Sequence, residues 1–144
     1  MIKLYVGCGL TRAPEDFKQK VAKLKERLKE IPSIEVLEFL GTEKGTSADV
    51  YVHDIVNCVD ECDIMLAICD EPSTGLGWEM CEQTKRGKPL LAFGHINSTV
   101  TRLVLDPPLE NYKFFRYQNF DEILDIAGAA IVAMRVGFPL EMFV

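Results

Sequence analysis

The sequence is poor in the residues on which several classes of protein depend. It contains one tryptophan, two histidines, and 16 basic residues against 22 acidic ones, which gives a net charge of -6 at pH 7. A chain of this charge is poorly suited to the phosphate backbone of DNA or RNA, so we expect no nucleic-acid polymer as a partner. A small anionic ligand is still compatible, because a few local hydrogen-bond donors are enough to bind it.

Long apolar runs and paired metal-binding motifs are also missing. The longest apolar run, Ile126 to Met134, is shorter than the roughly 20 residues that a membrane-spanning helix needs, so no membrane partner is expected. The five cysteines are odd in number and no secretory signal is recognisable, which favours free thiols and a cytoplasmic location. Without a CxxC pair or an HExxH motif, we predict structural thiols and no metal.

The remaining pattern is typical of an α/β protein, with short apolar runs alternating with amphipathic stretches. The predicted strands are Ile2–Val6, Ile34–Leu40, Ile64–Cys69, Pro89–Phe93 and Tyr112–Tyr117. The predicted helices are one from Pro14 to before Pro32, one over Ala48–Glu61 capped by Ser47, one over Gly77–Lys85, a short one before Pro107, and one from Asn119 or Asp121 to about Arg135. The pattern favours one domain over residues 1–144, a Rossmann-like or flavodoxin-like three-layer sandwich with a five-stranded parallel sheet of order 2-1-3-4-5.

In such a sheet, ligands bind beyond the carboxyl ends of the strands. The strongest candidate there is the segment PSTGLGWE, which runs from Pro72 to Glu79. Gly75 and Gly77 let the backbone approach a ligand, and helix-start N–H groups with the Ser73 hydroxyl can hold an anion. Glu79 lies in or just after the first turn, so its carboxylate can face the cleft. In the alternative interpretation, Ser73 is only a helix cap and Glu79 only complements the helix dipole.

A second carboxylate, Asp54, lies on the predicted helix before the third strand, whose inward stripe is predicted to comprise Val52, Ile55, Val56 and Val59. Two carboxylates near one cleft can divide the work of a nucleophile and of an acid or base. Alternatively, Asp54 belongs to a solvated helix face, since most aspartates are exposed.

The loop after the first strand reads Gly7-Cys8-Gly9-Leu10-Thr11-Arg12. A glycine-rich turn at this place is where nucleotide-binding α/β proteins hold phosphate. The full GxGxxG spacing is absent, because Arg12 occupies the position of the third glycine, so dinucleotide binding is disfavoured. Arg12 either meets a phosphate or is an ordinary surface charge.

Taken together, these features resemble the nucleoside 2-deoxyribosyltransferase superfamily. The segment PSTGLGWEM is similar to the PSxGxGxE signature of that superfamily, and the likeness is closest to its 2'-deoxynucleoside 5'-monophosphate N-glycosidase branch. Tyr5 before the Cys8-Gly9 turn, Asp54 with Asp63, and the pair Gly87-Lys88 agree with this resemblance. The sequence departs from the branch in the spacing from Asp54 to Asp63, which is one residue longer than in the nucleotide hydrolases.

The resemblance implies roles for individual residues. Glu79 matches the nucleophile that forms a covalent glycosyl-enzyme, Asp54 matches the acid/base group, and Tyr5 matches a tyrosine beside the nucleophile. Substrate contacts are implied for one further set of residues, within which Thr11 and Arg12 compete for one position: Cys8, Gly9, Thr11, Arg12, Ser73, Gly75, Gly77, Ser98 and Thr99. The resemblance also implies a homodimer or higher homo-oligomer, in which the Gly94–Thr101 loop of a neighbouring subunit completes the site, and no cofactor.

The favoured function is therefore cleavage of the N-glycosidic bond of a (deoxy)nucleoside 5'-monophosphate, which gives free base and sugar 5-phosphate. An alternative within the same chemistry is a nucleoside 2-deoxyribosyltransferase that exchanges bases between deoxynucleosides. A third possibility, from another class, is a non-catalytic nucleotide sensor on the same fold, because fold alone does not fix function.

Overall fold

The computed structural model describes residues 1–39 and 45–137 of the chain. The strands are β1 (Ile2–Cys8), β2 (Ile34–Leu37), β3 (Ile64–Ile68), β4 (Leu90–His95) and β5 (Tyr112–Tyr117). The helices are α1 (Glu15–Lys29), α2 (Ser47–Val50), η1 (Tyr51–Val59), α3 (Thr74–Lys85), α4 (Arg102–Leu105) and α5 (Phe120–Arg135). The predicted end of the second strand at Leu40, and the next four residues of the predicted loop, lie outside the described residues.

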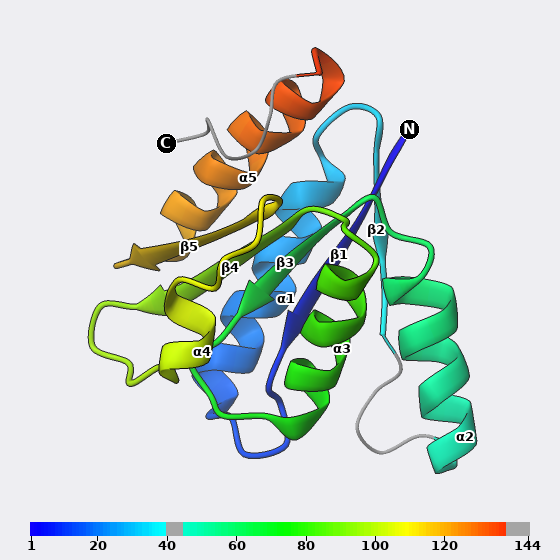
Figure 1. The fold of residues 1–144 in the computed structure, drawn as a ribbon. Helices are drawn as coiled ribbons and strands as arrows, with labels where there is room; N and C mark the ends of the chain where they lie inside the picture. Colours follow the sequence, from blue (N-terminus) through cyan, green and yellow to red (C-terminus); the bar gives the residue numbers. More distant parts are fainter. Residues whose placement is uncertain (40–44, 138–144) are drawn as a thin grey trace.

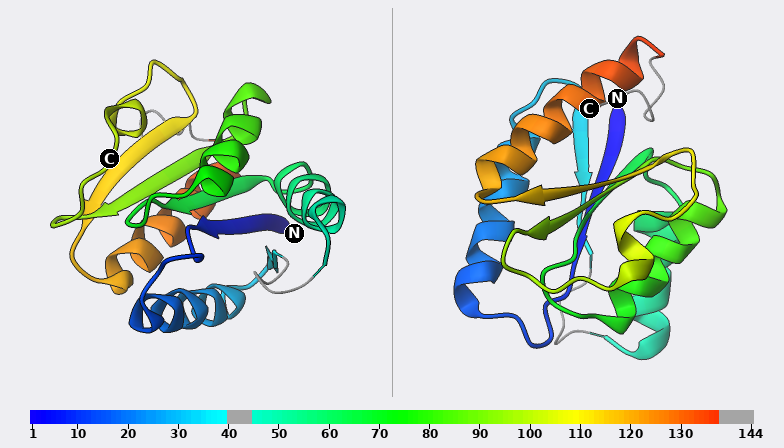
Figure 2. Two further views of the ribbon diagram at one scale, coloured as in Figure 1. Left: turned by 90° about the horizontal axis from the view of Figure 1, so that it is seen from below. Right: turned by 60° about the vertical axis from the view of Figure 1, so that its left-hand side comes forward.

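All five strands pair in parallel in the order β2-β1-β3-β4-β5, which confirms the predicted topology. Helices α1 and α5 cover one face of the sheet, and η1 and α3 cover the other (Figures 1 and 2). This is the three-layer α/β arrangement that the alternation of strands and helices predicts. Within residues 1–39 and 45–137, none of the helices has the length and apolarity to cross a lipid bilayer.

The alternation of side chains along the central strands divides the core into two clusters. In β1, Leu4 and Val6 pack towards α1 and α5, whereas Tyr5 between them packs towards η1 and α3. Successive side chains of a strand point to opposite faces, so this division follows directly from the pleat. The Tyr5 hydroxyl, which is the polar side-chain group of the run Leu4-Tyr5-Val6, thus points to the η1 and α3 face, where it meets Glu79.

Two helix starts differ from the prediction. Helix α3 begins at Thr74, three residues before Gly77, because the Ser73 hydroxyl accepts a hydrogen bond from the Leu76 N–H at 3.1 Å. Helix α2 is capped by Thr46, and not by Ser47, in a capping box that pairs Thr46 with Asp49 in both directions. In both places the cap side chain sets the first residue of the helix.

The predicted regular helix over Ala48–Glu61 is instead α2 followed by the nine-residue π-helix η1. A π-helix is rare and has more residues in each turn than an α-helix, so its buried face is rotated relative to the predicted one. Val52 and Val56, which were predicted to face inward, are 51% and 39% exposed. The buried residues of η1 are Ile55, Cys58 and Val59, and Asp54, four residues before Cys58, is half-buried on the adjacent side.

Candidate active site

Tyr5 and Glu79 form a hydrogen-bonded pair beneath η1. The Tyr5 hydroxyl donates a short hydrogen bond to Oε2 of Glu79, and both side chains are buried. Tyr5 comes from the middle of β1, and Glu79 is the sixth residue of α3. Glu79 therefore lies beyond the first turn of the helix, at only 9% exposure, which disfavours the alternative in which it merely complements the helix dipole.

The environment of Glu79 makes its carboxyl group unusually hard to ionise. The pKa of Glu79 is raised to about 7, mainly by burial; the Tyr5 hydrogen bond lowers it, the nearby Asp54 raises it and the Lys25 ammonium lowers it. Burial, followed by the neighbouring Glu79 carboxylate, raises the pKa of Tyr5 far above its usual range, so the phenol stays protonated and donates. Perturbed carboxyl groups in a cleft are candidates for catalysis.

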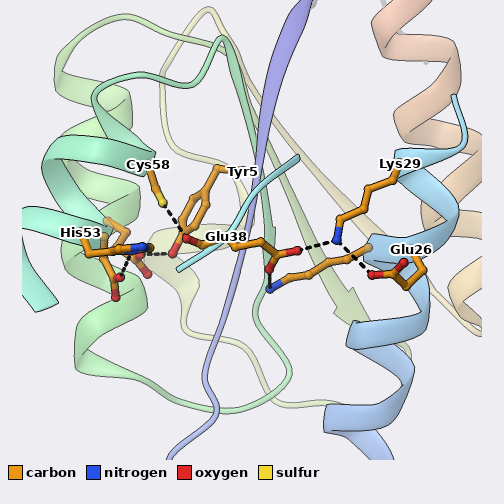
Figure 3. Close-up of polar contacts among 9 residues, drawn as sticks. Tyr5, Glu26, Lys29, Glu38, His53 and Cys58 are labelled. Atoms are coloured by element: carbon orange, nitrogen blue, oxygen red, sulfur yellow. Dashed lines mark hydrogen bonds and ion pairs between the residues drawn. The ribbon is translucent and has the colours of Figure 1, made fainter. Parts of the chain in front are cut away.

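Asp54 belongs to the same site. Its side chain is 17% exposed, and its Oδ1 lies 3.4 Å from Nδ1 of His53. Figure 3 shows Tyr5, His53 and Cys58 gathered on the η1 side of β1. Asp54 also contributes to the electrostatic potential at both Tyr5 and Glu79. The interpretation of Asp54 as part of a solvated helix face is therefore wrong.

Tyr5, Asp54 and Glu79 line a hollow of about 250 Å³, which we call the Glu79 hollow. Its other walls come from the loop after β1, the end of β2, α2 and the start of α3: Cys8, Leu10, Thr11, Phe39, Val50, Ser73, Gly75 and Leu76. Because β1 lies between β2 and β3, the hollow extends across the carboxyl ends of these three strands. This is the edge of the sheet at which parallel α/β proteins bind ligands.

The start of α3 forms the polar end of the Glu79 hollow. Ser73 caps the helix, and its O–H can still donate to a ligand, while Gly75 has open space where a side chain would stand. The N–H groups of the first helical residues lack partners within the helix, so they can bind an anion. No lysine, arginine or histidine is among the described residues that line this hollow.

Two of the residues predicted at the end of β1 and in the loop after it line the Glu79 hollow, and a third, Gly9, allows the loop to pack closely against the start of α3. Cys8 and Thr11 line the Glu79 hollow, whereas Arg12 is exposed and does not line it. A Cβ atom at Gly9 would come within 2.8 Å of both the Glu71 carbonyl oxygen and the Ser73 Cβ. Gly9 is thus needed for close packing of this loop against the start of α3, a role that sequence reasoning did not identify.

The other predicted residues lie outside the Glu79 hollow of the same chain. Thr99 and Gly77 line a neighbouring hollow of about 190 Å³, which shares Ser73 and Leu76 with it. Ser98 lines neither hollow, and its carbonyl oxygen accepts a hydrogen bond from Arg116 at 2.8 Å. A larger hollow of about 470 Å³ lies on the opposite face between α1 and α5, and none of the predicted site residues lines it.

Comparison with known proteins places these features in a family context. No protein-family model matches the chain. A protein of Thermofilum pendens named "Putative 2'-deoxynucleoside 5'-phosphate N-hydrolase 1" is 30% identical over 91 residues, which are 61% of this chain and 63% of that protein. The chain thus spans less than two thirds of the length of this relative.

Three solved structures share the fold. A CMP N-glycosidase of Clostridium botulinum superposes with a TM-score of 0.64 at 19% identity, covering 88% of this chain and 98% of the other. A 2-deoxyribosyltransferase of Bacillus psychrosaccharolyticus gives 0.58 at 18% identity over 85% and 90% of the two chains. A 2-deoxyribosyltransferase of Leishmania mexicana gives 0.55 at 17% identity over 73% and 69%.

The resemblance to the nucleoside 2-deoxyribosyltransferase superfamily is confirmed. The sequence relative bears the name of the nucleotide-hydrolase branch that the Pro72–Glu79 segment had indicated. The predicted α/β fold class is confirmed by the same structures. The roles of individual site residues remain predictions, supported by the geometry described above.

Sequence reasoning missed two residues beside the Glu79 hollow. Phe39, just past β2, forms part of its wall, and the Nζ of Lys25 lies 3.9 Å from the centre of the Phe39 ring. Lys25 is 6% exposed and forms an ion pair with Glu38 at 3.4 Å, while Figure 3 shows Glu38 reaching towards Lys29. An aromatic residue directly after a strand was the available signal for Phe39. Lys25 gave none, because it follows Leu24 in an ordinary amphipathic pattern.

The cysteines do not form a reactive cluster. All five are free thiols, and burial raises the pKa of Cys8 and Cys62 to about 11, and that of Cys58 and Cys69 to about 12. Thiols with raised pKa values are poor nucleophiles. Among the described residues, no three His, Cys, Asp or Glu side chains converge in a way that would hold a metal ion.

We predict that Glu79→Gln stabilises the folded protein in a pH-dependent way. The folded-state pKa of Glu79, about 7, lies above its ordinary value of 4.5, so the wild type loses stability relative to the variant as pH rises from 4.5 to 7. Urea unfolding should show little difference near pH 4 and a gain of about 2 to 3 kcal/mol for the variant near pH 8. Glu82→Gln, three residues further along α3, is the control, and an equal effect of Glu79→Gln at both pH values would contradict the burial argument.

Proposed function

We propose that this protein hydrolyses the N-glycosidic bond of (deoxy)nucleoside 5'-monophosphates, with Glu79 as the nucleophile. The observation that carries the proposal is the buried Glu79 carboxylate, hydrogen-bonded to Tyr5 and accompanied by Asp54 in one sugar-sized hollow. The names of the Thermofilum pendens and Clostridium botulinum proteins support nucleotide N-glycosidase chemistry for this chain.

In the proposed reaction, the Tyr5 hydroxyl holds Oε2 of Glu79 and leaves Oε1 to attack the anomeric carbon. The bond from that carbon to the base nitrogen breaks through an oxocarbenium-like state as the bond to Oε1 forms. The base takes its proton from Asp54, which therefore has to carry a proton when the substrate binds and becomes a carboxylate in this step. Water, deprotonated by Asp54, then attacks the same carbon and releases sugar 5-phosphate and the Glu79 carboxylate. Because Glu79 must be ionised to attack, its raised pKa sets the acidic limit of activity near neutral pH.

A 5'-phosphate is proposed to bind at the start of α3. The Ser73 hydroxyl and the N–H groups of Thr74 and Gly75 offer hydrogen-bond donors, and the positive end of the helix dipole lies there. No basic side chain is among the described residues that line the hollow, so we propose that Arg12 or a second subunit supplies the countercharge. The runner-up, a deoxyribosyltransferase, would need no such countercharge, because its substrate ends in a neutral 5'-OH.

We also propose that the protein is a homodimer or a larger homo-oligomer whose subunits share active sites. An apolar patch formed by Val50, Tyr51, Val52 and Trp78 borders the Glu79 hollow, and the Tyr51 and Trp78 rings pack edge to face at 6.4 Å. Exposed apolar patches of this kind mark interaction surfaces. At about 250 Å³, the hollow is smaller than the roughly 300 to 1,000 Å³ of ligand pockets, so a partner loop with Ser98 and Thr99 can complete it.

The proposed activity is tested by incubating the protein with deoxynucleosides, ribonucleotides and deoxynucleoside monophosphates, with and without an acceptor base. We expect free base and sugar 5-phosphate from monophosphates, with no base exchange. Glu79→Gln should lower turnover by about a thousandfold or more, while Glu82→Gln on the same helix retains it. Reaction of unphosphorylated substrates alone would favour the transferase, and nucleotide binding without turnover by the wild type would favour the sensor.

The proposed assembly is tested with Trp78→Arg, which places a charge in the centre of the apolar patch at a residue that is 58% exposed. Light scattering should show an oligomer for the wild type and a monomer with little activity for the variant. Val132→Arg changes an equally exposed residue on α5, on the opposite face, and should leave both properties unchanged. A monomeric and fully active wild type would contradict the proposal.

A further inference from the structure

The ammonium group of Lys88 binds the carboxyl end of η1. Its Nζ donates hydrogen bonds to three main-chain carbonyl oxygens, those of Val59 at 2.7 Å, Cys62 at 2.8 Å and Asp60 at 3.1 Å. A lysine ammonium has three N–H donors, so all of them are engaged. Lys88 itself lies between α3 and β4, far from η1 in sequence, and is half-buried.

These contacts meet two needs of a helix end. The last carbonyl groups of a helix have no N–H partner within it, and a cation there complements the negative end of the helix dipole. A second link lies nearby, where Arg86 forms an ion pair with Asp60 at 3.0 Å. The segment that follows α3 thus fixes the end of η1 relative to α3, the helix that carries Glu79.

The π-helical form of η1 determines where Asp54 points. η1 is a π-helix over Tyr51–Val59, and its wider turn places a different set of side chains on the buried face than an α-helix would. In the structure, Asp54 lies four residues before the buried Cys58 and lines the Glu79 hollow. An ordinary α-helix with the predicted inward stripe, centred on Val52 and Val56, would turn Asp54 away from the hollow.

We propose that Lys88 is a positioning residue for Asp54: by holding three carbonyl groups at the end of η1, it keeps this helix in the π-helical form that directs Asp54 into the Glu79 hollow. The role in turnover rests on the proposed N-glycosidase function, whereas the role in placing Asp54 does not. Lys88 is not among the residues that line the hollow, and its ammonium group is already bonded to three carbonyl groups, so we assign it no contact with substrate.

The test compares Lys88→Met, which keeps most of the side-chain length and removes the ammonium, with Lys85→Met, which removes an exposed ammonium from the end of α3. We expect Lys88→Met to lower kcat about tenfold or more, with a much smaller change in KM, because general acid–base catalysis contributes roughly 100- to 10,000-fold. In an Asp54→Asn background, Lys88→Met should cause little further loss, since both changes remove the same function. A loss of equal size in both backgrounds would overturn the proposal.

A crystal structure of Lys88→Met gives a readout that needs no activity. We expect η1 to change its hydrogen-bonding pattern and Asp54 to leave the hollow, while Tyr5 and Glu79 keep their contact. An unchanged η1 with Asp54 in place would overturn the proposal. If Lys88→Met does not fold, the same comparison uses Lys88→Arg, whose planar donors cannot converge on three carbonyl groups in the same way. If the wild type has no activity, the proposed function fails, and the position of Asp54 still decides the role of Lys88.

Discussion

The hydrogen bond from Tyr5 to Glu79 is the interaction on which the rest of the site depends. Removing a carboxylate from water is costly unless it gains hydrogen bonds, and the Tyr5 phenol supplies one from the middle of the sheet. Since Tyr5 is fixed by its strand neighbours on both sides, it also fixes the carboxylate. The sheet thus serves as a rigid support that holds one oxygen of Glu79 and leaves the other available.

Three further constraints hold the walls around this pair in place. Gly9 allows the loop after β1 to pack tightly against the Ser73 turn, so the start of α3 stays beside the carboxyl end of β1. On the other side, η1 is held by Lys88 and Arg86 and brings Asp54 to the same hollow. The apolar wall at Phe39 is supported by the buried Lys25, which pairs with Glu38. Segments that lie far apart in the sequence, from β1 to the turn after α3, therefore contribute to one small volume.

Much of the fold could be predicted from the sequence because its signals are local. The buried run from Ile64 gave β3, and Pro14 and Pro32 bracketed α1. The start of α3 was predicted three residues late, because two glycines at Gly75 and Gly77 suggested a loop while the Ser73 cap overrode their weak helix propensity. The π-helix was not predicted, since the valine pattern of η1 also fits an α-helix.

Among the site residues, the Glu79 signature could be predicted from sequence because it is a continuous segment at a strand–helix junction. Asp54 was a candidate from its place on the predicted helix, but its local sequence fits an exposed helix face as well. Tyr5 required the resemblance to other proteins, because nothing in its local sequence separates it from a core residue. Phe39, Lys25 and Lys88 contribute through contacts between distant segments, which spacing along the chain does not reveal. A single domain and a cytoplasmic location stay predictions.

The central claim is that the buried Glu79 carboxylate forms a covalent bond to the sugar. Mass spectrometry of the protein quenched with acid during turnover of a nucleoside monophosphate tests it most directly. The account predicts a sugar-phosphate adduct on the peptide that contains Glu79, absent from Glu79→Gln. Adduct formation on a different peptide, or full turnover by Glu79→Gln, would contradict it.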